Sequence, residues 1–63
     1  MNSYQYLDAL ISQKRDFIEA NSRLIKALEK SEHRFALRNY ILRLYKRVEE
    51  EQKDLEILLS HKK

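Results

Sequence analysis

Two ladders of apolar residues that are out of phase with each other constrain the fold of this chain most. Each ladder repeats at the heptad-like spacing of an amphipathic helix. The ladders comprise Tyr4, Leu7, Ile11, Ile18, Ile25 and Leu28, followed by Leu37, Ile41, Leu44, Val48, Leu55 and Leu58. Leu28 and Leu37 are nine residues apart, so one continuous helix at about 100° per residue would place the ladders on opposite faces. A break between the ladders lets them face each other.

The sequence therefore predicts an all-α fold, an antiparallel helical hairpin that forms a single domain over residues 1–63. We expect a first helix at about 3–29, a turn at about 30–33 and a second helix at about 33–60. The chain contains no glycine and no proline, a composition typical of long helices. One alternative stays open, because a weaker apolar stripe would support a single continuous coiled-coil helix. That stripe runs through Leu28, Phe35, Leu42 and Tyr45.

Polar residues at the predicted ends and in the seam support the hairpin. Asn2 or Ser3 can cap the first helix, and Ser31 is the natural cap of the second. Folding the chain at about 32–33 pairs positions whose numbers sum to 65. Lys14 occupies a position of the first ladder and Glu51 a position of the second, and the fold places them opposite each other. Arg15 likewise falls opposite Glu50. Asn21 also falls in the seam, where it either specifies register or faces solvent at the edge.

Beside the seam, each predicted helix carries a further apolar row. The first-helix row is Leu10, Phe17 and Leu24, and the second-helix row is Leu42, Tyr45 and Leu59. Two helices cannot bury both the seam and these rows, whereas four helices can. We therefore expect two hairpins to form a homodimeric four-helix bundle through both rows and Asn21, with a helix of a different protein as the alternative partner.

Composition excludes several classes of function. Without cysteine the chain has neither disulfides nor thiolate metal sites, and without glycine it lacks the usual phosphate-binding loops. His33 and His61 stand in no ligand motif, so we expect no catalytic, metal or cofactor site and no small-molecule substrate. No apolar run approaches the roughly 20 residues of a membrane span, and the N-terminal residues do not resemble a signal peptide. We expect a cytoplasmic protein that does not bind membranes.

Charge is distributed unevenly along the predicted hairpin. Residues 23–47, around the turn, contain eight basic and two acidic residues, whereas residues 48–56 contain one lysine and five acids. The candidate anion-binding or partner-binding patch comprises Arg34, Arg38, Tyr40, Arg43, Lys46 and Arg47. It can be a solvated basic face, a site for an acidic protein surface or a site for nucleic-acid phosphates. A fourth interpretation, an amphipathic helix on an anionic membrane, competes with burial of the seam.

In length and predicted topology the chain resembles the Rop family of RNA-binding hairpin dimers. Its segments YILRLYK at 40–46 and LLSH at 58–61 are similar in spacing to phycobilisome-degradation adaptors, which are also hairpin dimers. In size and helical pairing it resembles small type III secretion co-chaperones. Because amphipathic pairing is the dominant pattern, we predict a non-enzymatic protein-interaction module that acts on a larger protein as an adaptor, co-chaperone or inhibitor. The alternative is a Rop-like regulator that binds RNA or DNA through the basic patch.

Overall fold

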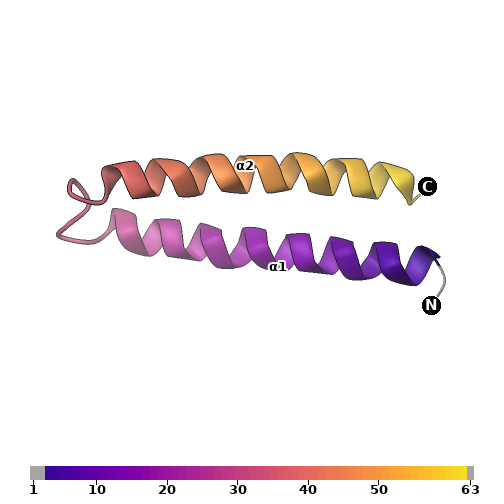
Figure 1. The fold of residues 1–63 in the computed structure, drawn as a ribbon. Coiled ribbons are helices and arrows are strands. Elements are labelled where there is room, and N and C mark those ends of the chain that lie inside the picture. The colour runs from indigo at the N-terminus through magenta and orange to yellow at the C-terminus, as the bar shows by residue number, and fades with distance from the viewer. Residues whose placement is uncertain (1–2, 63) are drawn as a thin grey trace.

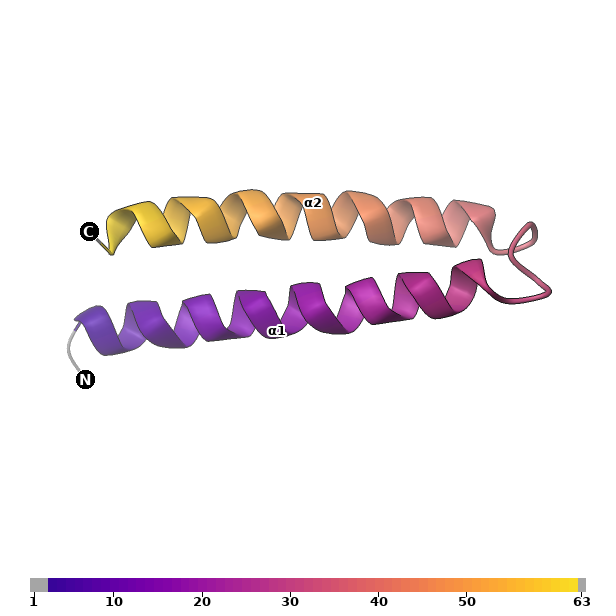
Figure 2. The same cartoon turned by 180° about the vertical axis from the view of Figure 1, so that it is seen from behind.

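The fold is a hairpin of two long helices, as the sequence predicts. A computed structural model describes residues 3–62, with helix α1 at Ser3–Glu29 and helix α2 at Arg38–His61. Figures 1 and 2 show the helices side by side and antiparallel, with the connection at one end and the outer helix ends at the other. The hairpin is 47 Å long but only 15 by 14 Å across, so every side chain lies close to the surface or to the seam between the helices.

The seam is built from the two apolar ladders. Four apolar side chains are buried among the described residues, and these are Ile11, Ile25, Ile41 and Val48. The last three form one cluster, and partly buried side chains from both helices pack against it, namely Ile18, Leu28, Leu37 and Leu44. Burying one such side chain contributes about 1.5–3 kcal/mol. Because Leu28 and Leu37 pack against the same cluster, the phase break between the ladders is resolved as predicted.

The connection reverses the chain without glycine or proline. The Ser31 amide donates to the Leu28 carbonyl at 3.1 Å, and the Arg34 amide donates to the Ser31 carbonyl at 3.2 Å. Within residues 3–62 no residue has a positive φ. Since no residue of the connection has a positive φ, none of these turns needs the freedom that glycine provides.

The second helix begins later than the predicted start near residue 33. The Ser31 hydroxyl accepts a hydrogen bond from the His33 amide at 3.1 Å. The prediction that Ser31 caps the second helix is wrong, however, because this turn does not continue into α2. Leu37 stands at the N-cap position of α2 with φ −93° and ψ 4°, outside the helical region, and makes no side-chain cap hydrogen bond. The Arg38 amide accordingly donates to the Phe35 carbonyl, at 3.3 Å. Packing of the Leu37 side chain against the core cluster outweighs the local helical preference.

Candidate interaction surfaces

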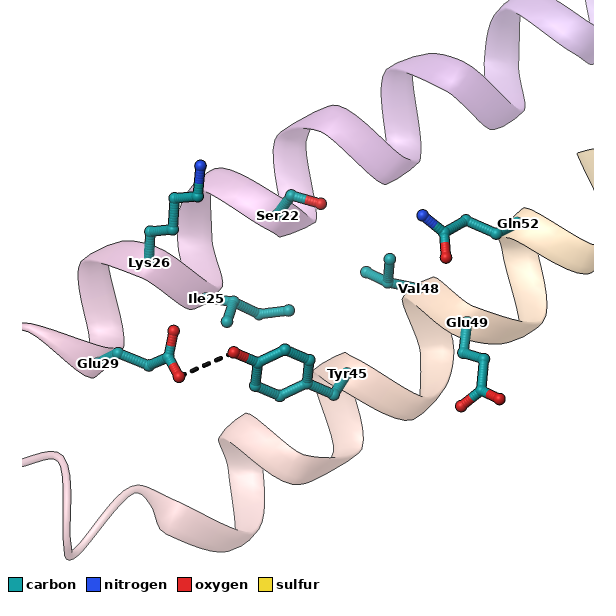
Figure 3. A pocket seen from close by; sticks show the side chains of 8 residues that line it. All are labelled: Ser22, Ile25, Lys26, Glu29, Tyr45, Val48, Glu49 and Gln52. Carbon is teal, nitrogen blue, oxygen red and sulfur yellow. Dashed lines mark hydrogen bonds between the residues drawn. The ribbon is translucent and has the colours of Figure 1, made fainter.

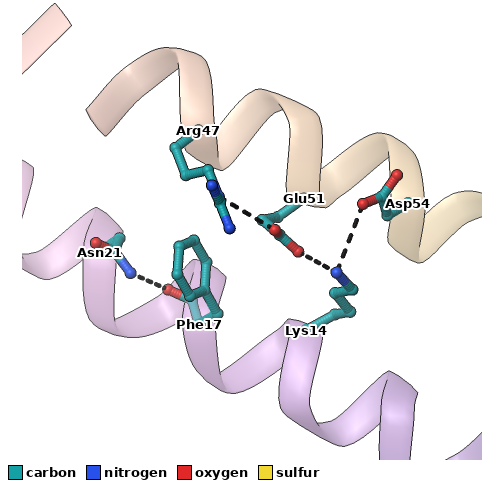
Figure 4. Close-up of polar contacts among 6 residues, drawn as sticks. All are labelled: Lys14, Phe17, Asn21, Arg47, Glu51 and Asp54. Carbon is teal, nitrogen blue, oxygen red and sulfur yellow. Dashed lines mark hydrogen bonds and ion pairs between the residues drawn. The ribbon is translucent and has the colours of Figure 1, made fainter. Parts of the chain in front are cut away.

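An ion-pair network joins the two helices near their middle. Lys14 Nζ lies 2.6 Å from Glu51 Oε2 and 3.5 Å from Asp54 Oδ2. Arg47 Nε lies 3.3 Å from Glu51 Oε1, so the Glu51 carboxylate holds one cation from each helix (Figure 4). The residue Glu51 is only 7% exposed. The predicted pairing of Lys14 with Glu51 is confirmed, and it fixes the register of the hairpin.

The electrostatics of this network keep both partners of the central pair ionised near neutral pH. Hydrogen bonding from Lys14 lowers the pKa of Glu51, although burial acts in the opposite direction. The same hydrogen bond raises the pKa of Lys14. Since the carboxylate is already satisfied by two cations, we assign it a structural role.

The second predicted charge match, Arg15 with Glu50, does not form an ion pair. Both residues are exposed, and no ion pair links them among the contacts of residues 3–62. At the open end of the hairpin, Lys62 Nζ instead lies 2.7 Å from Asp8 Oδ1. Exposed charged side chains gain little from pairing, so the sequence register alone does not determine their partners.

Leu10 and Phe17 of the first-helix row line surface hollows together with residues of the ion-pair network, and Figure 4 shows Phe17 beside Arg47. Leu10 and Phe17 are half-buried, and Leu24 is 38% exposed. The Arg47 guanidinium lies over the Phe17 ring, 5.5 Å from its centroid. Asn21 Nδ2 donates to the Phe17 carbonyl at 2.9 Å, which is a bond within α1. This hydrogen bond of Asn21 therefore does not cross the seam.

Tyr45 of the second-helix row lines a groove between the helices, shown in Figure 3, and Leu42 lines a neighbouring groove. The Tyr45 hydroxyl donates a hydrogen bond to Glu29 Oε2 at 2.8 Å. This bond, supported by burial, raises the pKa of Tyr45. Tyr45 remains 47% exposed and Leu42 58% exposed, whereas Leu59 is half-buried. The Tyr45 ring thus presents an apolar side to solvent while its hydroxyl is held in place.

The two rows lie on opposite sides of the seam. Tyr45 lines its groove together with Ser22 and Lys26, while Phe17 lines a separate one with Gln13 and Glu51. The reason is geometric. Successive residues of a helix are rotated by about 100° around its axis. In an antiparallel pair, residues that are rotated away from the seam in the same direction lie on the same side of the pair. The two rows are rotated away from the seam in opposite directions, so they lie on opposite sides.

At the turn end, apolar and basic side chains form what we call the turn-end groove. Its lining includes Arg34, Phe35, Arg38, Leu42 and Tyr45. Phe35 is 77% exposed, and the Arg34 guanidinium lies 5.2 Å from the centroid of its ring. The groove is therefore an apolar surface bordered by Arg34 and Arg38 and, on α1, by Glu29.

The predicted basic patch is only partly brought together. Arg34 and Arg38 line the turn-end groove, whereas Arg43 and Lys46 line a different surface hollow with Arg47. Tyr40 is 46% exposed. Apart from Arg47, which pairs with Glu51, no cation of the patch forms an ion pair within the described residues. These cations are available to an anionic partner.

Phe35 is the surface residue that the predicted interface missed. Its signal was the weaker apolar stripe from Leu28 to Tyr45, which had favoured a continuous helix. The turn separates the ends of this stripe, and Phe35, Leu42 and Tyr45 then line one groove. A stripe that crosses a chain reversal can thus mark a surface beside the turn.

Neither helix, over the part of the chain that the structure describes, is apolar enough along its length to cross a membrane. Within residues 3–62, no three His, Cys, Asp or Glu side chains come together in a group that could hold a metal ion. Known protein families, curated proteins and solved structures give no match to this chain. The case for a function therefore depends on the surfaces described above.

Proposed function

We propose that the chain is a cytoplasmic, non-enzymatic protein-interaction module that works as a dimer of hairpins and binds a larger protein as an adaptor, co-chaperone or inhibitor. The observation that carries this proposal is the turn-end groove. Phe35 and Leu42 are 77% and 58% exposed there, with Arg34 and Arg38 in the same lining. Aromatic anchors and arginine are the residues that dominate the energetics of protein interfaces.

The small core supports the same proposal. Four apolar side chains are buried among the described residues, whereas eight large ones are exposed. Contiguous exposed apolar patches are uncommon on monomeric proteins and mark interaction sites. Covering them with a second hairpin and a partner protein would add the burial that a chain of this size otherwise lacks.

A capture experiment with matched variants tests the proposal. The tagged chain is incubated with lysate from the native host after nuclease treatment, beside Leu42→Glu and Tyr4→Glu. These two residues are almost equally exposed, at 58% and 61%, but Tyr4 lies outside the turn-end groove. We expect the native chain and Tyr4→Glu to retain one protein partner and Leu42→Glu to lose it, because a charge disrupts an apolar contact. Equal capture by all three chains contradicts a role for the groove.

Nucleic-acid binding is the second candidate, supported by the patch cations that have no ion-pair partner in residues 3–62. Replacing Arg34, Arg38 and Arg43 together by Gln should leave helicity unchanged and weaken binding to RNA or DNA. Each lost phosphate contact should lower the log-log salt slope by about 0.7–0.9. Salt-sensitive nanomolar binding to a defined RNA, lost in this variant, would favour the second candidate over the first.

A further inference from the structure

We infer that a second copy of the chain packs, antiparallel, on the face that carries the first-helix row. The turn of each hairpin then lies at the open end of the other, and α1 packs against α1 of the second copy. This inference rests on the dimerisation proposed above and adds to it the face and the direction. A twofold axis crossing the helices at the level of Phe17 generates the arrangement.

The spacing of the first-helix row fits this axis. Leu10 and Leu24 lie seven residues before and after Phe17. An antiparallel second copy therefore places Leu10 against Leu24 of its partner, and the two Phe17 rings meet at the axis. All three side chains keep exposed surface in the hairpin, 38% in the case of Leu24. The row is thus complementary to itself, as an isologous interface requires.

The same axis fits the face of α2 beside this row. In the register of the Lys14–Glu51 pair, Phe17 is level with Val48. Arg47 of one copy therefore falls level with Glu49 of the other, and two residues, or about 3 Å along the helix axis, from the level of its Glu51. The Arg47 side chain is 60% exposed in the hairpin, so a cation of each copy lies near carboxylates of the other.

Apolar residues further along α2 follow the same symmetry. Tyr40, 46% exposed, falls within two residues of the level of the half-buried Leu58 of the other copy. Aromatic and aliphatic contacts therefore extend from the centre of the interface toward both of its ends.

Charge along the chain selects the antiparallel direction. Residues 23–47 carry eight basic and two acidic residues, and residues 48–56 carry five acids and one lysine. With the turns at opposite ends, the basic end of each hairpin lies along the acidic part of the other. With the turns together, the two basic ends would repel each other. Like-charge juxtaposition therefore disfavours the arrangement with the turns together.

The size of the face is sufficient, and the other face stays free. The hairpin measures 47 by 15 Å along and across this face, close to the roughly 800 Å² per partner of a standard stable interface. Leu42 and Tyr45 line the groove on the opposite side of the seam. A dimer formed in this way leaves the turn-end groove open to a different protein.

A distance between the two turns tests the direction. The chain has no cysteine, so Ala36→Cys, an exposed position in the turn, gives one spin label per copy. Pulsed electron paramagnetic resonance of the dimer should show a label separation close to the 47 Å length of the hairpin. A separation below about 25 Å, as for two hairpins packed at ~10 Å with turns together, would overturn the inference while leaving dimerisation intact.

Matched variants test the face and separate this inference from the proposed function. In sedimentation equilibrium, Leu24→Glu should raise the dimer dissociation constant by at least about a hundredfold, and Leu42→Glu by less than about threefold. The reverse order would assign the dimer to the other face and overturn the inference alone. A native chain that is folded and monomeric at millimolar concentration, and stays so after 100-fold dilution, would overturn the proposed dimer as well.

Discussion

Lys14 Nζ lies 2.6 Å from Glu51 Oε2, and this ion pair joins the two helices across the seam between them. Glu51 is the buried polar residue of the described chain, at 7% exposure, and Arg47 on its own helix completes its coordination. The contact sets which residues of α1 lie level with which residues of α2. It therefore determines both the seam and the surfaces on either side of it.

Removing this carboxylate should destabilise the hairpin. We expect Glu51→Gln to lower the melting temperature by at least about 5 °C, because Lys14 and Arg47 lose a partner that is largely withdrawn from water. Glu50→Gln is the matched control, since Glu50 is exposed and forms no ion pair within residues 3–62. Both variants are followed by circular dichroism at one protein concentration. Equal melting temperatures of the two variants would show that the Lys14–Glu51 pair does not contribute to stability.

The same contact makes a prediction about pH. The pKa of Glu51 is lower in the folded chain than in the unfolded chain, chiefly because Lys14 donates a hydrogen bond to it. Its stabilisation is therefore complete above the ordinary pKa of glutamate, about 4.3, and is lost as the pH falls through the lowered folded value. The difference in melting temperature between the native chain and Glu51→Gln should shrink below about pH 4. A difference that stays constant from pH 7 to pH 2 would contradict this explanation.

The turn provides a third prediction. Ser31→Ala removes the hydroxyl that accepts the hydrogen bond of the His33 amide. We expect this change to lower the unfolding free energy by about 0.5–1.5 kcal/mol, the usual net contribution of one hydrogen bond. Ser12→Ala, at an exposed position inside α1, should be neutral or slightly stabilising because alanine favours helix. Urea denaturation of both variants measures the effect, and equal midpoints would show that this hydrogen bond does not stabilise the turn.

Much of the hairpin could be predicted because burial leaves a periodic trace in the sequence. The ladders that contain Ile25 and Val48 identify the seam, and the opposite charges of Lys14 and Glu51 identify its register. Periodicity does not reveal where tertiary packing ends a helix. Leu37 leaves the helical region while its side chain packs against the core, so α2 begins at Arg38.

The surfaces were predicted less well for two physical reasons. Residues of one helix that flank the seam can be identified from spacing, but the side they occupy depends on the reversed direction of the second helix. The sequence therefore did not indicate that Phe17 and Tyr45 line separate grooves. The hydrogen bond from Tyr45 to Glu29 depends on the rotamers of two exposed side chains, for which the sequence pattern contains no signal.

The most direct test of the account is the reactivity of thiols placed on its two faces. Leu24→Cys and Leu42→Cys each introduce the only thiol of the chain, and their reaction with a chromogenic disulfide is timed across protein concentrations that span dimer formation. The account predicts that the thiol at position 24 reacts at least about tenfold more slowly in the dimer, whereas the thiol at position 42 changes by less than about twofold. Protection at position 42 with unchanged reactivity at position 24 would contradict the division into a dimer face and a partner face.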